Sequence, residues 1–502
     1  MKSSILRKHQ GTLLATTLLD RLFSLAMTAG IVFALCTAAA IPSPAQESEF
    51  HSLFSFDGTC KSGANPGFGN LVQGLDGSLS GTTEVCSGSG GTVFKFATTA
   101  SKPTVLYVFC LKGGPCSDGA KPYAGLTLAS NGNLYGTTYF GGASNYGTVF
   151  QITSAGKWTP VFSFSGANGE EPQAAPFQAK DGNLYGSTTS GGSDGVGTLY
   201  EMTTAGGDEV SVSFTGENGE IPYAPLVQGK NGNIYGTTSQ VTSGNGAVIV
   251  ILPKTGLKKT PLYTFQGVKN GGNPYGGLLQ ATDGNFYGTT STGGANSQGG
   301  TIFSMTPAGK LKTIYSFCAK PNCTDGRNPL TSLIQANDGN LYGTTAFGGT
   351  NETSCNSGCG TIFSITTAGK LTTLYNFCGL ANCADGSQPE GGLVQATNGT
   401  FYGTTFSGGT VGLGTVFSLS VEELKPFVKI LPAWGTAGAT AMILGDNLTG
   451  ATKVTFNGAP AAFTVVSSTA IKATVPTGAT TGTVAVDTPG GTLESNALFQ
   501  VD

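Results

Sequence analysis

Seven stretches of alternating apolar and polar residues return along most of the chain in the same pattern. A representative copy reads Gly132-Asn-Leu-Tyr-Gly-Thr-Thr138. An apolar run and an Asn-Gly or Asp-Gly pair come at the start of each copy, and a second alternating run begins at a later Gly-Thr step. Period-two alternation is typical of β-strands, and an Asx-Gly pair between two strands favours a tight hairpin because both residues need positive φ. Each copy therefore predicts several antiparallel strands.

The spacing of the copies predicts a β-propeller. Measured between the second glycines of the motif, successive copies are 55, 50, 50, 52, 55 and 60 residues apart. These glycines are Gly81, Gly136, Gly186, Gly236, Gly288, Gly343 and Gly403. The period is too long for a solenoid coil but suits a four-stranded propeller blade of roughly 40 to 50 residues with loop insertions. We therefore expect an all-β fold with a seven-bladed propeller over residues 48–421.

The last repeat, which includes residues 391–420, shows how one blade is expected to fold. The first strand is expected at 391–396 and the second at 401–405, while a Gly-Thr step opens the third. The seventh repeat stops after its third strand, near Ser420, whereas residues 51–56 near the N-terminus match the pattern of a fourth strand. We expect the N-terminal strand to complete the last blade and close the ring, which removes open sheet edges.

Antiparallel connectivity divides the predicted loops between two faces. The Asx-Gly turns and the third-to-fourth turns lie on one face and are uniform. The second-to-third loops and the links between blades lie on the other face, where every length change and every cysteine outside the N-terminal segment falls. Six of the seven inner strands carry a glutamine at one position, with Leu128 as the exception. These glutamines are expected either to line the central channel or to form hydrogen bonds between blades.

The two ends of the chain follow other patterns. Basic residues and an apolar run from Leu22 to Ile41 predict a signal peptide over residues 1–45, with cleavage after residue 45 or residue 40. A retained membrane anchor is the alternative, since the run approaches the length that spans a bilayer. After a linker at 422–426, short strands with Gly and Pro turns over 427–502 predict a small immunoglobulin-like β-sandwich.

Composition excludes several functions. Lys and Arg number 25 against 28 Asp and Glu, giving a net charge of -3, so the chain lacks the basic footprint of a nucleic-acid-binding protein. The chain contains two histidines, His9 and His51, which argues against a serine–histidine triad or a histidine-rich metal site. We expect no cofactor, no bound metal, no membrane span in the mature chain and a monomer.

Ten cysteines remain after Cys36, which lies in the predicted signal. An even number in an exported protein favours disulfides over metal binding. Local spacing predicts the pairs Cys110–Cys116, Cys318–Cys323, Cys355–Cys359 and Cys378–Cys383, and the two thiols left over predict Cys60–Cys86.

The repeated D-G-N-L-Y-G-T-T and G-T-[VI]-F units closely resemble the GloVer (Gloeo/Verruco) tandem-repeat family of exported bacterial proteins, over about residues 50–420. The sequences V-T-F-N-G and T-P-G-G near the C-terminus resemble IPT/TIG domains, which are immunoglobulin-like. The first resemblance implies export but no enzymatic activity, and the second implies a spacer or an interaction module. The protein is therefore expected outside the cell or in the periplasm.

Aromatic residues just beyond the motif, on the variable face, are the candidate ligand-binding residues. They are Tyr139, Phe140, Tyr146, Phe347 and Phe406. Loop packing is the alternative account of these side chains. The tyrosine inside the motif is expected to pack between blades. The Asx residue of each turn is expected to serve the hairpin and not a calcium ion.

Paired carboxylates give a second candidate site. Glu170 and Glu171, and then Glu217 and Glu220, occupy the same inter-blade loop of neighbouring repeats and could serve glycoside hydrolysis. Solvated turn residues are the simpler interpretation. The sequence thus favours a secreted, non-catalytic protein that binds a glycan or a surface protein through its variable face. The alternatives are a glycan-active hydrolase or lyase and a purely structural extracellular protein.

Overall fold

The computed structural model describes residues 47–111, 115–207, 209–242, 244–296, 299–351, 355 and 357–502. The predicted signal peptide and its cleavage site lie outside the described residues. The chain divides into Met1–Glu47 and a compact unit, Ser48–Asp502. In the described part of that unit the regular structure consists of β-strands and three single-turn 3-10 helices, Pro253–Thr255 (η1), Pro321–Cys323 (η2) and Ala381–Cys383 (η3), without an α-helix. The all-β prediction is confirmed.

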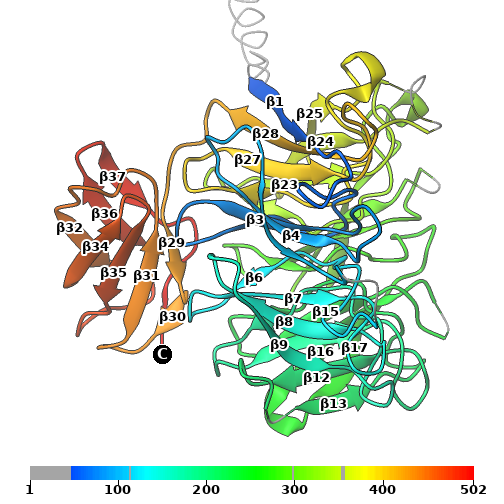
Figure 1. Ribbon diagram of the computed structural model, residues 1–502, viewed down its shortest axis with the longest axis horizontal. Helices are drawn as coiled ribbons and strands as arrows, with labels where there is room; N and C mark the ends of the chain where they lie inside the picture. The colour runs from blue at the N-terminus through cyan, green and yellow to red at the C-terminus, as the bar shows by residue number, and fades with distance from the viewer. Residues whose placement is uncertain are drawn as a thin grey trace, which may run out of the picture. The chain divides into compact units, whose positions relative to one another are not determined.

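Seven four-stranded antiparallel sheets form the repeat region (Figure 1). The inner strands are β2 (Val72–Gln73), β6 (Thr127–Leu128), β10 (Phe177–Gln178), β14 (Val227–Gln228), β18 (Leu279–Gln280), β22 (Ile334–Gln335) and β26 (Val394–Gln395). The second strands are β3 (Leu79–Thr83), β7 (Leu134–Thr138), β11 (Leu184–Thr188), β15 (Ile234–Thr238), β19 (Phe286–Thr290), β23 (Leu341–Thr345) and β27 (Phe401–Thr405). The third strands are β4 (Thr92–Phe96), β8 (Thr148–Ile152), β12 (Thr198–Met202), β16 (Ala247–Leu252), β20 (Thr301–Met305), β24 (Thr361–Ile365) and β28 (Thr415–Val421). The outer strands are β5 (Thr104–Val108), β9 (Trp158–Ser163), β13 (Val210–Ser213), β17 (Lys258–Thr264), β21 (Leu311–Ser316), β25 (Leu371–Asn376) and β1 (Ser48–Ser55).

The N-terminal strand β1 belongs to the same sheet as the last three strands of the repeat region. It pairs antiparallel with β28, from Ser48 opposite Val421 to Ser55 opposite Thr415, and the sheet order is β1-β28-β27-β26. Figure 1 shows β1 beside β28 although the two are far apart in the sequence. The ring of Phe50 stacks on Tyr375 of the preceding sheet, with centroids 3.7 Å apart.

The second glycine of the repeated motif lies directly across from a large side chain of the third strand. Gly136 pairs with Phe150, and Gly403 pairs with Phe417. A Cβ atom on Gly136 would lie 2.6 Å from Cζ of Phe150, so the ring occupies the space that a side chain would need. The other five copies repeat this pairing, with Phe, Tyr or Ile as the partner. The glycine is therefore required for packing within each sheet.

The tyrosine of the motif forms a hydrogen bond that the sequence analysis did not predict. Its hydroxyl contacts the side chain of the Asx residue four positions earlier, as in Tyr287 and Asp283, which are 2.8 Å apart. The same pair recurs in five further copies. In the first copy Ser80 replaces the tyrosine, and Asp76 contacts Lys95 instead. The Asx residue thus serves both the turn and the tyrosine that follows it.

The inner-strand glutamines join neighbouring sheets. The Oε1 atom of Gln178 accepts a hydrogen bond from the backbone N–H of Ser130 in the preceding sheet, at 2.8 Å, and its Nε2 donates to Gly182 O within its own turn. Gln228, Gln280 and Gln335 make the same two bonds. Gln73 of the first sheet and Thr397 of the seventh are likewise bonded. Of the two expected roles, bonding between sheets is the one that these contacts show.

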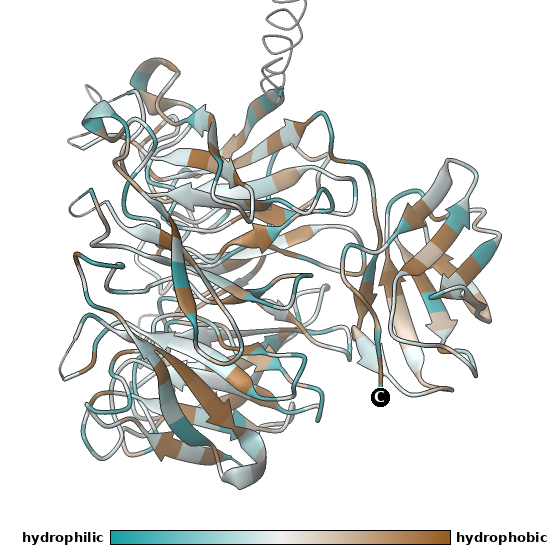
Figure 2. Ribbon diagram, turned by 180° about the vertical axis from the view of Figure 1, so that it is seen from behind, coloured by the Kyte–Doolittle hydropathy of each residue, from teal (hydrophilic) through white to brown (hydrophobic). Residues whose placement is uncertain are grey.

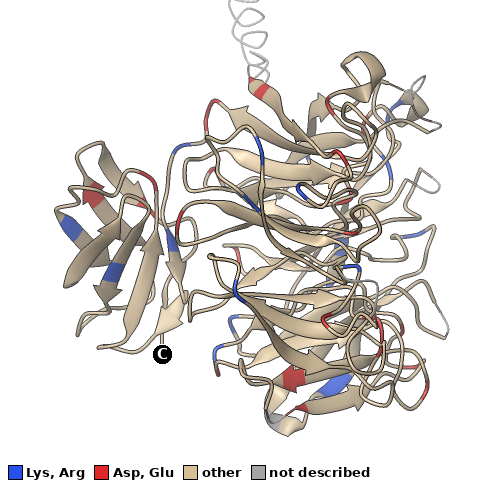
Figure 3. Cartoon of the chain, in the orientation of Figure 1, with Lys and Arg blue, Asp and Glu red and all other residues tan. Residues whose placement is uncertain are grey.

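The core of the repeat region lies between adjacent sheets. One buried cluster joins Tyr135 and Val149 of the second sheet with Leu184 and Tyr200 of the third. Figure 2 shows the corresponding alternation of apolar and polar residues along the strands, and Figure 3 shows charged residues concentrated in turns and loops. We call the face that carries the Asx-Gly turns the turn face, and the face that carries the links between sheets and the cysteines the loop face.

The C-terminal region forms a small sandwich. One sheet has the order β29-β31-β35-β34 and the other β33-β32-β36-β37, and the short β30 and β38 pair in parallel. The strands are β29 (Lys429–Leu431), β30 (Trp434–Gly435), β31 (Thr440–Leu444), β32 (Lys453–Phe456), β33 (Ala459–Pro460), β34 (Phe463–Ser467), β35 (Ala470–Thr474), β36 (Val484–Thr488), β37 (Gly491–Glu494) and β38 (Gln500–Val501). Its core includes Ile443, Phe456, Ile471, Val486 and Phe499.

Candidate functional site

The segments that lead into the inner strands approach one another closely on the loop face. A Cβ atom on Gly69 would lie 1.8 Å from the backbone nitrogen of Gly125, and one on Gly276 would lie 2.4 Å from Thr331 O. The space is too narrow for side chains at these positions, which explains the Gly and Ala residues there. Each inner strand has two residues. The inner strand expected at 391–396 is therefore shorter than predicted, because β26 pairs only at Val394 and Gln395.

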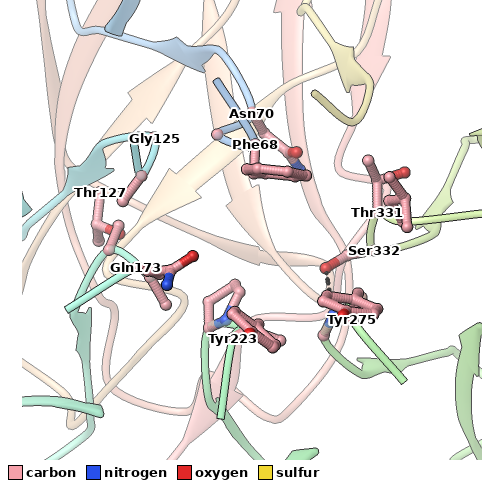
Figure 4. A pocket seen from close by; sticks show the side chains of 18 of the residues that line it. Phe68, Asn70, Gly125, Thr127, Gln173, Tyr223, Tyr275, Thr331 and Ser332 are labelled. Atoms are coloured by element: carbon pink, nitrogen blue, oxygen red, sulfur yellow. Dashed lines mark hydrogen bonds between the residues drawn. The ribbon is translucent and has the colours of Figure 1, made fainter. Parts of the chain in front are cut away.

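A cavity of about 390 Å³ opens where these lead-in segments meet, and six of the seven segments line it. Three aromatic side chains from different segments border it: Phe68, Tyr223 and Tyr275 (Figure 4). The rings of Tyr223 and Tyr275 are stacked with centroids 4.7 Å apart and an interplanar angle of 26°. Phe68 is 41% exposed. We call the half-buried, stacked pair Tyr223 and Tyr275 the tyrosine wall, and Phe68 adds a more accessible ring across the cavity from it (Figure 4).

Polar groups complete the lining. Gln173 donates from Nε2 to Thr189 Oγ1 over 3.4 Å. The hydroxyl of Ser332 accepts a hydrogen bond from Gly277 N over 2.9 Å, drawn as a dashed line in Figure 4. Asn70 accepts from Gly392 N with its Oδ1 atom. An aromatic wall with a few oriented amides and hydroxyls is the usual composition of a site for a neutral, polar ligand.

An acidic and aromatic cluster lies on the same face, on lead-in segments and second-strand exits of the first, second and seventh sheets. The hydroxyl of Tyr123 donates to Glu84 Oε1 over 2.8 Å, and Lys121 Nζ lies 3.6 Å from the same oxygen. Burial, with a smaller contribution from the Glu84 carboxylate, raises the pKa of Glu390 to about 7. Glu390 therefore holds a proton to near-neutral pH, a property that general acids share.

Two predicted residues, Tyr139 and Glu171, connect this cluster to the tyrosine wall. The ring of Tyr139 packs edge-on against Tyr123, with centroids 5.1 Å apart. Burial, followed by a hydrogen bond to Glu171, raises the pKa of Tyr139. The Glu171 carboxylate also contributes to the raised pKa of Tyr223, after burial and Tyr275. Tyr139 and Glu171 thus lie within electrostatic range of the tyrosine wall.

The other predicted ligand-binding residues do not line the cavity. Phe140 packs edge-on against Tyr139, and Tyr146 is 38% exposed beside Gly166. Phe347 and Phe406 are half-buried. Arg327 pairs with Phe347 through a backbone bridge, and Asn65 donates to the carbonyl of Phe406.

The remaining predicted carboxylates lie in the loops between sheets. Glu170 and Glu220 form equivalent backbone bridges, with Ser190 and Gln240. Glu217 is exposed. Sequence reasoning did not select Phe68, Tyr223, Tyr275 or Glu390. The available signal was their position one or two residues after the proline of each Gly-x-x-Pro element, at a site that differs between copies.

Five disulfides lie on the loop face. They join Cys60–Cys86, Cys110–Cys116, Cys318–Cys323, Cys355–Cys359 and Cys378–Cys383. These are the pairs expected from the sequence, and several disulfides fit an extracellular protein. Within the described residues, no helix has the length and apolar character needed to cross a membrane.

The chain is similar to two known families and to several solved structures. The model of the Gloeobacter/Verrucomicrobia repeat matches residues 112–268 and 228–460, and that of the IPT/TIG domain matches residues 427–501. No curated protein matches the sequence. A fungal alcohol oxidase of the AA5 family, solved with copper, is similar in fold, with a TM-score of 0.50 and 12% identity over 91% of this chain and 99% of the other. Oligogalacturonate lyase from Vibrio parahaemolyticus aligns with a TM-score of 0.47 and 9% identity over 75% of this chain and 98% of the other.

Proposed function

Because the chain belongs to the Gloeobacter/Verrucomicrobia repeat family and carries a C-terminal IPT/TIG domain, we propose that it is an extracellular repeat protein that binds a carbohydrate. In this proposal the seven sheets are the blades of a closed propeller, β1 completes the last blade, and the ligand enters the cavity on the loop face. The mature protein acts as a monomer in the periplasm or outside the cell.

The observation that carries the proposal is the stacked pair Tyr223 and Tyr275 at the wall of the cavity. Sugar rings present flat C–H faces that pack on aromatic side chains, while their hydroxyls bond to amides and hydroxyls. Gln173, Asn70 and Ser332 supply such groups. The side chains lining the cavity include no charged group, which favours a neutral sugar over an acidic one.

The test is a screen of neutral oligosaccharides followed by calorimetric titration. We expect Tyr223→Ala and Tyr275→Ala to weaken binding roughly tenfold or more, the effect of losing about 1.4 kcal/mol of contact. Tyr146→Ala is the matched control, since this exposed tyrosine lies outside the cavity, and its affinity is expected to be unchanged. Binding that survives both cavity substitutions but is lost with Tyr146→Ala would move the site to the outer loops.

A glycan-active enzyme is the second candidate, and Glu390 is the observation that favours it. A protonated carboxyl with a second carboxyl, Glu84, in its electrostatic environment has the components of acid–base chemistry. This candidate places the reacting groups at Glu84 and Glu390, in place of the predicted Glu170, Glu171, Glu217 and Glu220. It predicts product release from a polysaccharide that Glu390→Gln abolishes and Glu217→Gln leaves intact. A purely structural protein would show neither turnover nor saturable binding.

A further inference from the structure

Four cysteines of the sixth repeat lie in a single cluster on the loop face. Cys355–Cys359 lies in the loop between β23 and β24, and Cys378–Cys383 follows β25. All four sulfur atoms lie within 4.8 Å of one another. The Sγ atoms of Cys355 and Cys378, which belong to different disulfides, are 3.7 Å apart. Two loops of the same sheet thus bring two disulfides into contact.

The 3.7 Å between the Sγ atoms of Cys355 and Cys378 is close to the ligand–ligand distance in a tetrahedral metal centre, whereas the two sulfurs bonded in each disulfide lie closer and would have to separate on reduction. Zinc–sulfur bonds of about 2.3 Å place the four ligand atoms of a tetrahedron about 3.8 Å apart. Each loop supplies two sulfurs from nearby positions, with three residues between Cys355 and Cys359 and four between Cys378 and Cys383. Short separations of this kind are typical of cysteine pairs in structural zinc sites. Cys359 and Cys378 are buried, so they would shield part of a bound ion from water.

Hydrogen bonds that do not involve the cysteine sulfurs hold both loops in place. The buried carboxylate of Asp385 accepts hydrogen bonds from the hydroxyl of Tyr375 at 2.7 Å and from the backbone N–H of Gly379 at 2.9 Å. On the other loop, Asn351 donates from Nδ2 to Phe377 O over 2.7 Å. Reduction of the sulfur–sulfur bonds would leave these contacts in place and keep the thiols close together.

The fifth repeat provides an internal comparison. Its loop after β21 has the same construction: a Cys318–Cys323 disulfide, with Asp325 accepting from Tyr315 at 2.7 Å and from Ala319 N at 3.0 Å. The facing loop, residues 291–300, contains no cysteine. A single disulfide therefore suffices for this type of loop, and the second disulfide of the sixth repeat is an addition to it.

We propose that, after reduction of both disulfides, Cys355, Cys359, Cys378 and Cys383 bind one thiophilic divalent cation of the Zn²⁺ class, and that reoxidation releases it. Each disulfide takes up two electrons and two protons and gives two thiols. A phosphine, used in the test below, supplies the electrons and becomes a phosphine oxide while one water molecule supplies its oxygen and the two protons; in a cell a dithiol protein supplies both electrons and protons and becomes a disulfide. On binding, the four thiols lose their protons and coordinate the cation as thiolates. In the oxidised chain the sulfurs are bonded in pairs and carry no metal.

The test uses the full mature chain, reduced with a water-soluble phosphine and then freed of the phosphine under anaerobic conditions. Titration with Co²⁺ is expected to give thiolate charge-transfer bands and the ligand-field spectrum of a tetrahedral site, saturating at one ion per chain. Zn²⁺ should displace the Co²⁺, and a disulfide oxidant should release the metal. Circular dichroism must show that the reduced chain keeps its β-structure, and loss of that structure would overturn the proposal.

Two double variants locate the site. Cys355→Ser with Cys359→Ser should abolish the tetrahedral spectrum and the bound equivalent, yet should fold, since the fifth repeat carries the same lone disulfide. Cys318→Ser with Cys323→Ser removes an equivalent number of thiols and should retain the full equivalent of metal. No uptake by the reduced parent chain, or equal uptake by both variants, would show that the cluster is not a metal site.

Discussion

The turn face and the loop face of the repeat region are built from the same seven copies but differ in how far the copies agree. On the turn face, six copies form an Asx–Tyr hydrogen bond of 2.7 to 3.1 Å, in which the hydroxyl donates to Asp or accepts from Asn. On the loop face, the residue after the proline of the Gly-x-x-Pro element differs between copies: it is Gly67, Tyr123, Gln173, Tyr223, Tyr275, Leu330 or Glu390. The repeated residues hold the sheets together, whereas four of the varying residues border the cavity: Gln173, Tyr223, Tyr275 and Leu330.

The largest expected effect comes from removing the N-terminal strand. A chain that begins at residue 56 lacks β1, so β28 becomes an open edge and the contacts of Phe50 with Tyr375, Phe377 and Phe417 are lost. We expect a loss of about 5 kcal/mol or more in the free energy of unfolding, because the three contacts of a half-buried aromatic ring and a strand ladder disappear together. Thermal unfolding against a chain that begins at residue 47 measures it. Equal melting temperatures would contradict the closure of the ring by β1.

Glu390→Gln is expected to stabilise the protein, and only above acidic pH. The folded-state pKa of Glu390 is raised to about 7 from 4.5, so its ionisation in the folded protein costs stability as the pH rises through this window. The glutamine variant should therefore be up to about 3 kcal/mol more stable at pH 8 and similar to the parent at pH 4. Urea unfolding at the two pH values tests this. Glu217→Gln, at an exposed position, should change stability at neither pH. A gain for Glu390→Gln that does not depend on pH would show that the pKa of Glu390 is not raised.

A substitution at the second glycine of the repeated motif should lower the stability of the protein. Gly403→Ala places a Cβ atom 2.5 Å from Cζ of Phe417, and the ring has to move within a closely packed sheet. We expect a loss of about 2 kcal/mol. Gly490→Ala in the sandwich is the control, because its Cβ would meet its nearest neighbour at 3.7 Å. Under conditions where both variants are folded, their ligand affinity should equal that of the parent. A weaker affinity for Gly403→Ala would contradict the division between a repeated motif that stabilises the sheets and a loop face that binds the ligand.

The smallest expected effect comes from restoring a repeated threonine–threonine hydrogen bond in the fourth copy, which lacks it. In six copies the last threonine of the motif bonds to a threonine of the third strand, as Thr138 does to Thr148 at 2.8 Å. In the fourth copy Ala247 stands opposite Thr238, whose buried hydroxyl has no partner among the described residues. Ala247→Thr should raise stability by about 1 kcal/mol. Ala247→Val adds the same volume without the hydroxyl, and an equal gain from it would assign the effect to packing.

The parts of the fold that could be predicted are those that the chain repeats. Periodicity and the Asx-Gly turns indicated four strands in each copy, and the fourth-strand pattern at residues 51–56 indicated the partner of β28. The length of the inner strands could not be predicted, because it depends on the close approach of segments such as Gly69 and Gly125. That approach is a property of the assembled sheets and not of any single copy.

The candidate site could be predicted only in part, for a related reason. Tyr139 and Glu171 were selected from the sequence and lie beside the tyrosine wall. Tyr223 and Tyr275 occupy a position where three copies have Tyr and the others have Gly, Gln, Leu or Glu, so the repeat does not mark this position for one role. Their stacking, and the raised pKa of Glu390, arise from contacts between residues that are distant in the sequence.

Among the described residues, the inner-strand glutamines link neighbouring sheets at all junctions but one. Each glutamine ties its sheet to the preceding one, and Gln73 ties the first sheet to the seventh. Leu128 occupies this position in the second sheet, where it packs against a buried apolar cluster that includes Val93, Leu126 and Leu134. The junction between the first and second sheets therefore lacks the glutamine link, and side chains on the loop face, such as Tyr123 bonded to Glu84, join these two sheets instead.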